Sequence, residues 1–185
     1  MSVATALLLD NAVKSLRFEP WDPLNARLND EQGARCYTVS TNLHAKKRLT
    51  VIRSSDTNRH ELASLEWKNW VSDKISLRGS EQMSISKFLD GRTFTGSDGQ
   101  KYKWVKKSLP SFALELVLAN REQTVVGRFR PESKNDSTPA TLALDANGVK
   151  QEELAIVSLV ILLKHYCGTD PSALAFRQTQ QDMFV

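Results

Sequence analysis

Residues Leu154–Leu163 read LAIVSLVILL, and Ser158 is the one polar side chain in these ten positions. Two glutamates precede the run, and a lysine and a histidine follow it. This charge order favours a helix, because the helix macrodipole attracts acids to its start and cations to its end. A helix without a polar face must be buried on all sides. We therefore expect a central, fully surrounded helix over residues 151–166.

The chain before this helix has the patterns of short β-strands separated by turns. The alternation is clearest in Glu61–Lys68, which places Ala63, Leu65 and Trp67 on one face. Ser97-Asp98-Gly99 predicts a hairpin turn. We expect polar loops at Pro20–Gly33 and Pro131–Pro139 and a turn at Asp145–Gly148. The expected strands are Ser15–Phe18, Cys36–Thr41, Leu49–Arg53, Glu61–Lys68, Lys74–Leu77, Ile85–Leu89, Thr93–Phe94, Lys101–Val105, Phe112–Leu118, Val125–Phe129 and Thr141–Leu144.

Consecutive strands of this kind usually pair as antiparallel neighbours, and a sheet with so many strands curls or closes. The inside of a closed barrel must be filled, and the apolar helix is suited to fill it. The sequence thus predicts a mainly β protein with one hydrophobic C-terminal helix. An antiparallel barrel and a strongly curved sheet fit the pattern equally well. We expect an N-terminal segment at 1–13, one domain at 14–168 and a tail at 169–185.

The bulk composition is that of a globular protein. The 185 residues are 41% hydrophobic and 25% charged, with a net charge of +4. The apolar helix is shorter than the roughly 20 residues that span a bilayer, and no basic residue precedes the apolar N-terminal stretch at 3–9. Cys36 and Cys167 form no disulfide framework. These features predict an intracellular, cytoplasmic protein with free thiols, as a monomer or weak homo-oligomer without a transmembrane segment.

Several segments carry a resemblance to known proteins. They are Tyr37-x-Val39, Leu49–Arg53, Leu65-Glu66-Trp67, Phe88-Leu89, Phe94, the DGxxYxW element at Asp98–Trp104, and Val125–Phe129. With the apolar helix, this order resembles an uncharacterised family of basidiomycete fungal proteins, over about residues 14–166. That family is similar to the tubby C-terminal-like superfamily, which includes phospholipid scramblases and LURP-one-related proteins.

The resemblance implies a β-barrel around a central hydrophobic helix, in agreement with the pattern of the residues. Tubby domains bind phosphoinositides through basic side chains, so the resemblance also implies a lipid-binding module. None of those basic residues can be assigned to this chain by motif. The fungal family itself carries no known function.

The first candidate ligand site is the basic cluster of Lys46, Lys47, Arg48 and Arg53, with Arg59 nearby. Lysine and arginine hold phosphate oxygens, and arginine does so with two parallel hydrogen bonds. A solvated hairpin, or lysines that protect an edge strand, would have the same sequence. Arg128 and Arg130, on either side of Phe129, are the second candidate.

The other motifs do not predict nucleic-acid binding, metal binding or catalysis. Lys101 and Lys103 interleave with Tyr102 and Trp104, but strand alternation places rings and charges on opposite faces, which disfavours nucleic-acid binding. His165 and Cys167 have no partner at metal-ligand spacing. The sequence has no recognisable catalytic or nucleotide-binding motif, so it predicts no catalytic residue, metal or cofactor.

Three functions fit these observations. The first is a non-enzymatic binding module for an anionic lipid headgroup or another phosphorylated ligand. The second is a protein–protein interaction or structural module whose charges serve solubility. The third is a small-molecule enzyme with a loop-borne site that has no linear motif.

Overall fold

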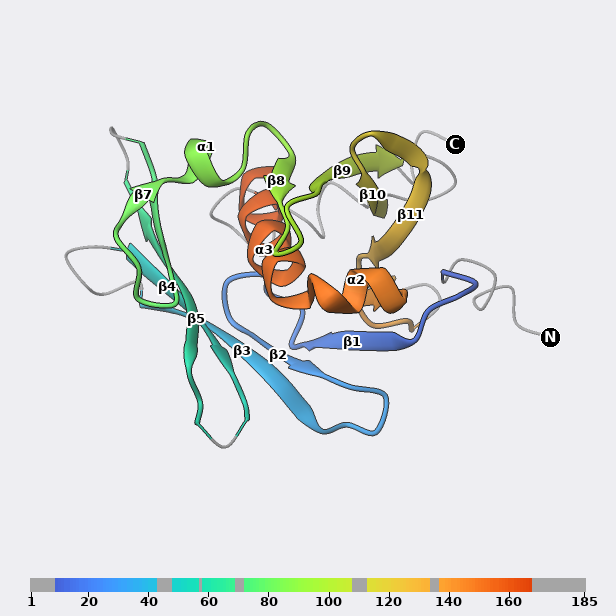
Figure 1. Cartoon of the computed structure of the whole chain (residues 1–185). Helices are drawn as coiled ribbons and strands as arrows, with labels where there is room; N and C mark the ends of the chain where they lie inside the picture. Colours follow the sequence, from blue (N-terminus) through green and yellow to red (C-terminus); the bar gives the residue numbers. More distant parts are fainter. Residues whose placement is uncertain are drawn as a thin grey trace, which may run out of the picture.

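The computed structural model describes residues 9–42, 48–56, 58–68, 72–107, 113–133 and 137–167. In this part of the chain, a 12-stranded antiparallel sheet curves around one long helix, α3 (Glu152–Cys167) (Figure 1). The strands are β1 Lys14–Glu19, β2 Ala26–Asn29, β3 Arg35–Asn42, β4 Arg48–Ser54, β5 Glu61–Trp67, β6 Lys74–Leu77, β7 Met83–Ser84, β8 Thr93–Thr95, β9 Lys101–Lys107, β10 Ala113–Leu118, β11 Arg121–Arg130 and β12 Thr141–Leu144. The two short helices are α1 Ile85–Phe88 and α2 Ala146–Lys150.

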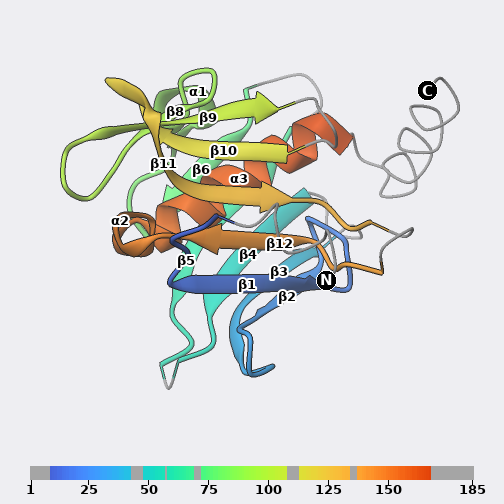
Figure 2. The same ribbon diagram turned by 90° about the vertical axis from the view of Figure 1, so that its right-hand side faces the viewer.

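The strand order is β7-β6-β5-β4-β3-β2-β1-β12-β11-β10-β9-β8. Neighbours in the sheet are neighbours in the chain, except where β1 pairs with β12 and joins the two halves (Figure 2). The edge strands β7 and β8 follow one another in sequence, with α1 between them. Backbone hydrogen bonds therefore do not close the sheet within the described residues, and the predicted mainly β, curved architecture is confirmed.

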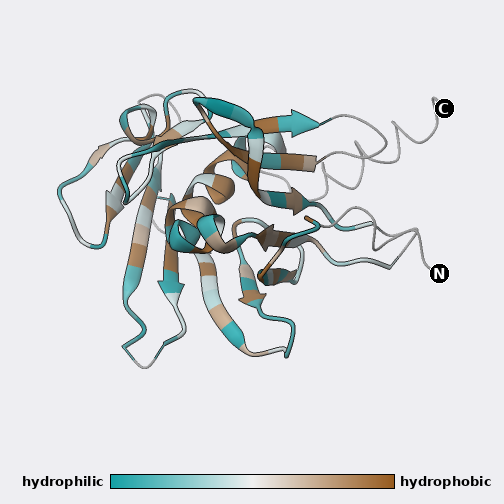
Figure 3. Cartoon of the chain, turned by 45° about the vertical axis from the view of Figure 1, so that its right-hand side comes forward, coloured by the Kyte–Doolittle hydropathy of each residue, from teal (hydrophilic) through white to brown (hydrophobic). Residues whose placement is uncertain are grey.

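The helix α3 is surrounded by the sheet, as its composition requires. Ala155 to Leu163 are each at most 5% exposed. Along the strands, apolar and polar positions alternate, and α3 is apolar over most of its length (Figure 3). Large, fully buried side chains come from both halves of the sheet: Leu16, Phe18, Leu28, Ile52, Leu65, Ile75, Phe94, Trp104, Leu114, Leu116 and Phe129. The predicted helix is confirmed, with its bounds shifted by one residue.

Ser158, the polar residue of the apolar run, is fully buried and hydrogen-bonded on both sides. Its Oγ accepts a 2.9 Å hydrogen bond from Nε1 of Trp104 on β9 and donates one of 3.1 Å to the carbonyl of Ala155. A buried indole N–H needs such an acceptor, because water cannot reach it. This contact fixes the rotation of α3 relative to β9.

We expect Ser158→Ala to lower the free energy of unfolding by about 1–3 kcal/mol, because the Trp104 N–H loses its acceptor. Urea denaturation followed by tryptophan fluorescence measures this. Ser158→Thr, which keeps the hydroxyl, is the comparison for the added methyl group. An unchanged midpoint for Ser158→Ala would show that the hydrogen bond does not contribute to stability.

The DGxxYxW element forms a hairpin between β8 and β9 that holds the start of α3. The Asp98 carboxylate accepts hydrogen bonds from the Gln100 backbone N–H (3.0 Å) and the Tyr102 hydroxyl (2.8 Å), and both lower the pKa of Asp98. The Ser97 backbone N–H donates to the Gln151 side chain at 2.8 Å. A Cβ on Gly96 would lie 2.6–2.8 Å from three of these side chains. The predicted hairpin is confirmed, and its motif residues serve the fold.

Three predicted segments differ in the structure. Pro20–Gly33 is not a continuous loop, because it contains β2, whose inward Ala26 and Leu28 are too few to reveal the strand by alternation. Ile85–Leu89 is not a strand, because the Ser84 hydroxyl caps the short helix α1. Asp145–Gly148 is more than a turn. The Asp145 carboxylate accepts from the backbone N–H groups of Asn147 (2.9 Å) and Gly148 (2.7 Å) and begins α2.

The face assignment of β11 is also corrected. Simple alternation predicts Val125 on the same face as Gly127 and Phe129, but Val126 is the fully buried valine. A β-bulge shifts the register here, because Leu116 is opposite Gly127 whereas Val117 is opposite Val125. The extra residue turns Val126 towards the core.

Candidate anion-binding site

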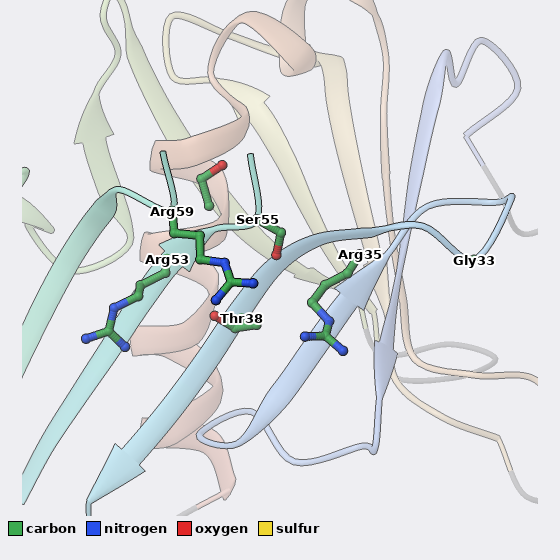
Figure 4. A pocket seen from close by; sticks show the side chains of 7 residues that line it. Gly33, Arg35, Thr38, Arg53, Ser55 and Arg59 are labelled. Atoms are coloured by element: carbon green, nitrogen blue, oxygen red, sulfur yellow. The ribbon is translucent and has the colours of Figure 1, made fainter. Parts of the chain in front are cut away.

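A hollow of about 530 Å³ lies on the outer face of the sheet, over β3, β4 and the loop that follows β4. We call it the arginine pocket. It is lined by Gly33, Arg35, Thr38, Arg53, Ser54, Ser55 and Arg59. Figure 4 shows the guanidinium groups of Arg35, Arg53 and Arg59 on the side of the strands turned away from α3. The lining consists of cations, hydroxyl groups and one glycine, without an aromatic ring.

Two of the lining residues are placed by strand alternation. Thr38 on β3 and Arg53 on β4 are opposite each other in the antiparallel register. Tyr37, Val39 and Ile52 beside them in sequence point to the core and are at most 9% exposed. Because successive side chains of a strand point to opposite faces, Thr38 and Arg53 face outward.

Arg35 reaches the same face through a β-bulge. By alternation from Tyr37, Arg35 would point to the core. In the β2–β3 register, however, Leu28 is opposite Tyr37 and Asn29 is opposite Arg35, so Cys36 is the extra residue. A bulge re-aims the side chains beyond it. Arg35 is therefore exposed and lines the pocket together with Thr38 and Arg53.

The loop between β4 and β5 supplies the third arginine and Ser55, and Ser54 is the last residue of β4. The ends of this loop are held by a 3.0 Å backbone hydrogen bond from Ser54 N–H to the His60 carbonyl. Arg59 has a φ of 44°, a left-handed conformation that is uncommon for a residue with a side chain. Its backbone N–H donates to the Asp56 carbonyl at 3.0 Å. The loop thus turns tightly enough to bring Arg59 back over the strands.

The arginines of the pocket differ in their partners from those cations of the protein that form short salt bridges. Lys14, Lys103, Arg128 and Lys164 each lie 2.7–3.3 Å from a carboxylate. Arg53 has only a long contact of 4.0 Å with Glu61. Arg35 and Arg59 form neither a salt bridge nor a side-chain hydrogen bond with any residue in the described ranges. Three guanidinium groups therefore share one hollow with little internal neutralisation.

Two ionisable side chains near the pocket, Cys36 and Tyr37, are held in their neutral forms. Burial raises the pKa of the Cys36 thiol, which lies 3.7 Å from the carbonyl of Ala34. Burial and the nearby Glu152 carboxylate raise the pKa of Tyr37. Both groups therefore stay protonated at neutral pH.

The structure separates the predicted basic residues. Arg53 lines the pocket, and Arg59 joins it from the predicted neighbourhood. Arg48 lies five residues before Arg53 at the other end of β4, about 17 Å away along the strand. Lys46 and Lys47 lie outside the described residues, so the predicted cluster is represented here by Arg48 and Arg53 alone.

The second predicted pair lies elsewhere on the sheet. Arg128 and Arg130 are on β11, four strands from β3, which is about 19 Å at normal strand spacing. Arg128 contacts Glu115 at 2.8 Å. This pair therefore does not join the arginine pocket. Arg35, Thr38 and Ser55 were not predicted as site residues. Arg35 reaches the pocket through a bulge and Ser55 through a loop, and Thr38 becomes part of the site only because β3 pairs with β4.

The structure also places the aromatic residues of β9 and the histidine near the end of α3. Tyr102 and Trp104 are at most 2% exposed, so their rings are inside the fold and cannot stack on bases. His165 is near the end of α3, where burial and the adjacent Lys164 lower its pKa. Among the described residues, no group of three or more His, Cys, Asp or Glu side chains could hold a metal ion. None of the described helices is long and apolar enough to cross a membrane.

The comparisons with known proteins concern most of the chain. A protein of Arabidopsis thaliana with an X-ray structure is similar to it, with a TM-score of 0.49 and 12% identity over 83% of this chain and 90% of that chain. No curated protein matches the sequence. The model of a family of unknown function, DUF6593, matches residues 21–165, which include the whole arginine pocket and most of α3. The chain therefore belongs to the DUF6593 family.

Proposed function

We propose that this protein is a non-enzymatic binding module for a phosphorylated ligand, and that the arginine pocket is its binding site. The observation that carries the proposal is the convergence of three arginines that have little or no internal neutralisation. Guanidinium groups bind phosphate oxygens through paired hydrogen bonds, and the hydroxyls of Thr38 and Ser55 can donate further ones.

The lining residues also restrict which chemical group can accompany the phosphate in the ligand. A nucleotide base would need an aromatic or apolar surface, which the seven lining residues do not supply. A polar, phosphorylated headgroup matches the cations and hydroxyls better. We therefore favour the headgroup of an anionic lipid. We also propose that the chain is a member of the tubby C-terminal-like superfamily and is related to fungal proteins. The curved sheet around α3 supports this part of the proposal.

Vesicle sedimentation tests the lipid source of the ligand. We expect the protein to sediment with vesicles that contain phosphoinositides and to remain in solution with neutral phosphatidylcholine vesicles. Added salt should weaken the binding, because exposed charges are screened beyond about 8 Å at physiological ionic strength. Soluble inositol phosphates should compete if the headgroup alone is recognised.

Substitutions identify the site. Arg53→Ala should weaken binding about tenfold or more, since a hydrogen bond to a charged group contributes about 1.5–3 kcal/mol. Arg35→Ala and Arg59→Ala should act similarly, whereas Arg121→Ala, which removes an exposed arginine on β11, should have little effect. Equal binding to neutral vesicles, or equal loss in the Arg121 variant, would contradict the proposal. Binding to neither vesicles nor inositol phosphates would favour a protein–protein interaction module.

A further inference from the structure

An exposed leucine lies on the same face of the sheet as the arginine pocket. Among the described residues, Leu49 and Val13 are the two large hydrophobic side chains that are exposed to solvent. Leu49 and Arg53 both belong to β4, four residues apart, and both are exposed. Because the side chains of a strand alternate between its faces, Leu49 and Arg53 point to the same outer face. They lie about 13 Å apart at normal strand geometry.

The surface between these two residues is apolar and is bordered by short side chains. Val51 is half-buried between Leu49 and Arg53 on the same outer face. In the register of the sheet, Val51 is opposite Ser40 of β3 and Ser64 of β5. Serine side chains are shorter than valine, so they leave the apolar groups accessible to a partner. We call the surface formed by Leu49, Val51 and the arginine pocket the docking face.

The carboxylate opposite Leu49 is covered. Glu66 of β5 is the partner of Leu49 in the β4–β5 register, but it is only 6% exposed. The Gln82 side chain donates a 3.3 Å hydrogen bond to this carboxylate, and the Lys68 ammonium lies 3.9 Å from it. The negative charge of Glu66 therefore does not oppose an anionic partner as an exposed acid would.

We infer that the docking face binds an anionic membrane surface, with a lipid headgroup in the arginine pocket and Leu49 inserted between the lipids beside it. The inference rests on the proposed function and deepens it, because it assigns the ligand of the pocket to a membrane. The cations of the pocket complement anionic headgroups. The headgroup region accommodates apolar side chains to a depth of about 5–10 Å, so Leu49 leaves water there. A soluble phosphorylated compound in the pocket would leave Leu49 exposed.

Vesicle sedimentation of Leu49→Ser tests the apolar contact. With phosphatidylcholine vesicles that contain phosphoinositides, the dissociation constant should be about fivefold higher than that of the unmodified protein, because binding strengthens with the apolar area that the membrane buries. The affinity for a soluble inositol trisphosphate should stay the same, since Leu49 does not line the pocket. Leu49→Trp should bind the vesicles at least as tightly as the unmodified protein, because tryptophan favours the membrane interface.

Val13→Ser is the matched control, because it removes the other exposed large hydrophobic side chain, which is 64% exposed. The registers from β1 to β4 place Val13 and Leu49 towards opposite ends of the sheet, about 30 Å apart along the strands. The control should therefore bind the vesicles and the inositol trisphosphate like the unmodified protein.

The two ligands separate the inference from the proposed function. A Leu49→Ser variant that binds the vesicles as tightly as Val13→Ser would overturn the inference and leave the proposed function intact. An equal loss for vesicles and inositol trisphosphate would also overturn it, because Leu49 would then support the pocket instead of contacting lipid. Binding of inositol trisphosphate without binding of vesicles would show that the ligand is soluble. If the unmodified protein binds neither, the proposed function fails together with the inference.

Discussion

Ile156→Asp should unfold the protein. Ile156 is fully buried on α3, and the residues around it in the core are apolar. An aspartate there loses the apolar burial of the isoleucine and places a polar or charged group where it has no partner, at a combined cost of about 5 kcal/mol or more. The total stability of a domain of this kind is about 5–15 kcal/mol, so the substitution removes most or all of it.

Circular dichroism and thermal melting measure this effect. The matched control is Val13→Asp, which makes a comparable change at a side chain that is 64% exposed. The control should change the free energy of unfolding by less than about 0.5 kcal/mol. A soluble Ile156→Asp variant with a cooperative melt like that of the control would show that α3 does not occupy the core.

The sequence predicts those parts of the fold that depend on local periodicity. The run from Leu154 to Leu163 has no polar face, and burial of a helix on all sides follows directly from that composition. The alternation around Tyr102 and Trp104 likewise predicts which side chains are inside. In both segments, a single physical rule acts over enough consecutive residues to be recognised without knowledge of the neighbouring strands.

The site was only partly predictable, because its geometry arises from departures from regular structure. Arg53 is a strand residue on an outward face and was identified from the sequence. Arg35 reaches the pocket through the extra residue Cys36 in the β2–β3 register, and no composition rule indicates such a bulge. Arg59 depends on a left-handed backbone conformation at a residue other than glycine. The pairing of strands, rather than the order of residues, therefore assembles the site.

The segment from Asp145 to Gly148 shows that local composition alone does not distinguish a turn from the start of a helix. Its composition is that of a turn, and aspartate is common both in turns and at the start of helices. The difference lies in tertiary contact. The Asp145 backbone N–H donates to the Val126 carbonyl at 3.0 Å, while its carboxylate caps α2. The bulged residue of β11 therefore determines where the short helix α2 begins.

Gly148→Ala should destabilise the protein by about 3 kcal/mol or more, at the upper end of the cost of overpacking. A Cβ on Gly148 would lie 2.2 Å from the Val126 carbonyl oxygen and 3.2 Å from Cδ2 of Leu144. The Val126 carbonyl cannot withdraw without losing the hydrogen bond from Asp145. At an open helical position the same substitution would stabilise by about 1 kcal/mol, so the sign of the effect distinguishes a packed α2 from a loose one.

Urea denaturation of Gly148→Ala, beside the exposed Asn147→Ala as control, measures this sign. The control should stay within about 0.5 kcal/mol of the unmodified protein, because its side chain lies on the surface of α2. A Gly148→Ala variant that is as stable as the control, or more stable, would show that α2 does not pack against β11. The expected loss would instead establish that Gly148 is required for close approach of α2 to Val126. Since α2 leads directly into α3, this contact also fixes where the central helix enters the sheet.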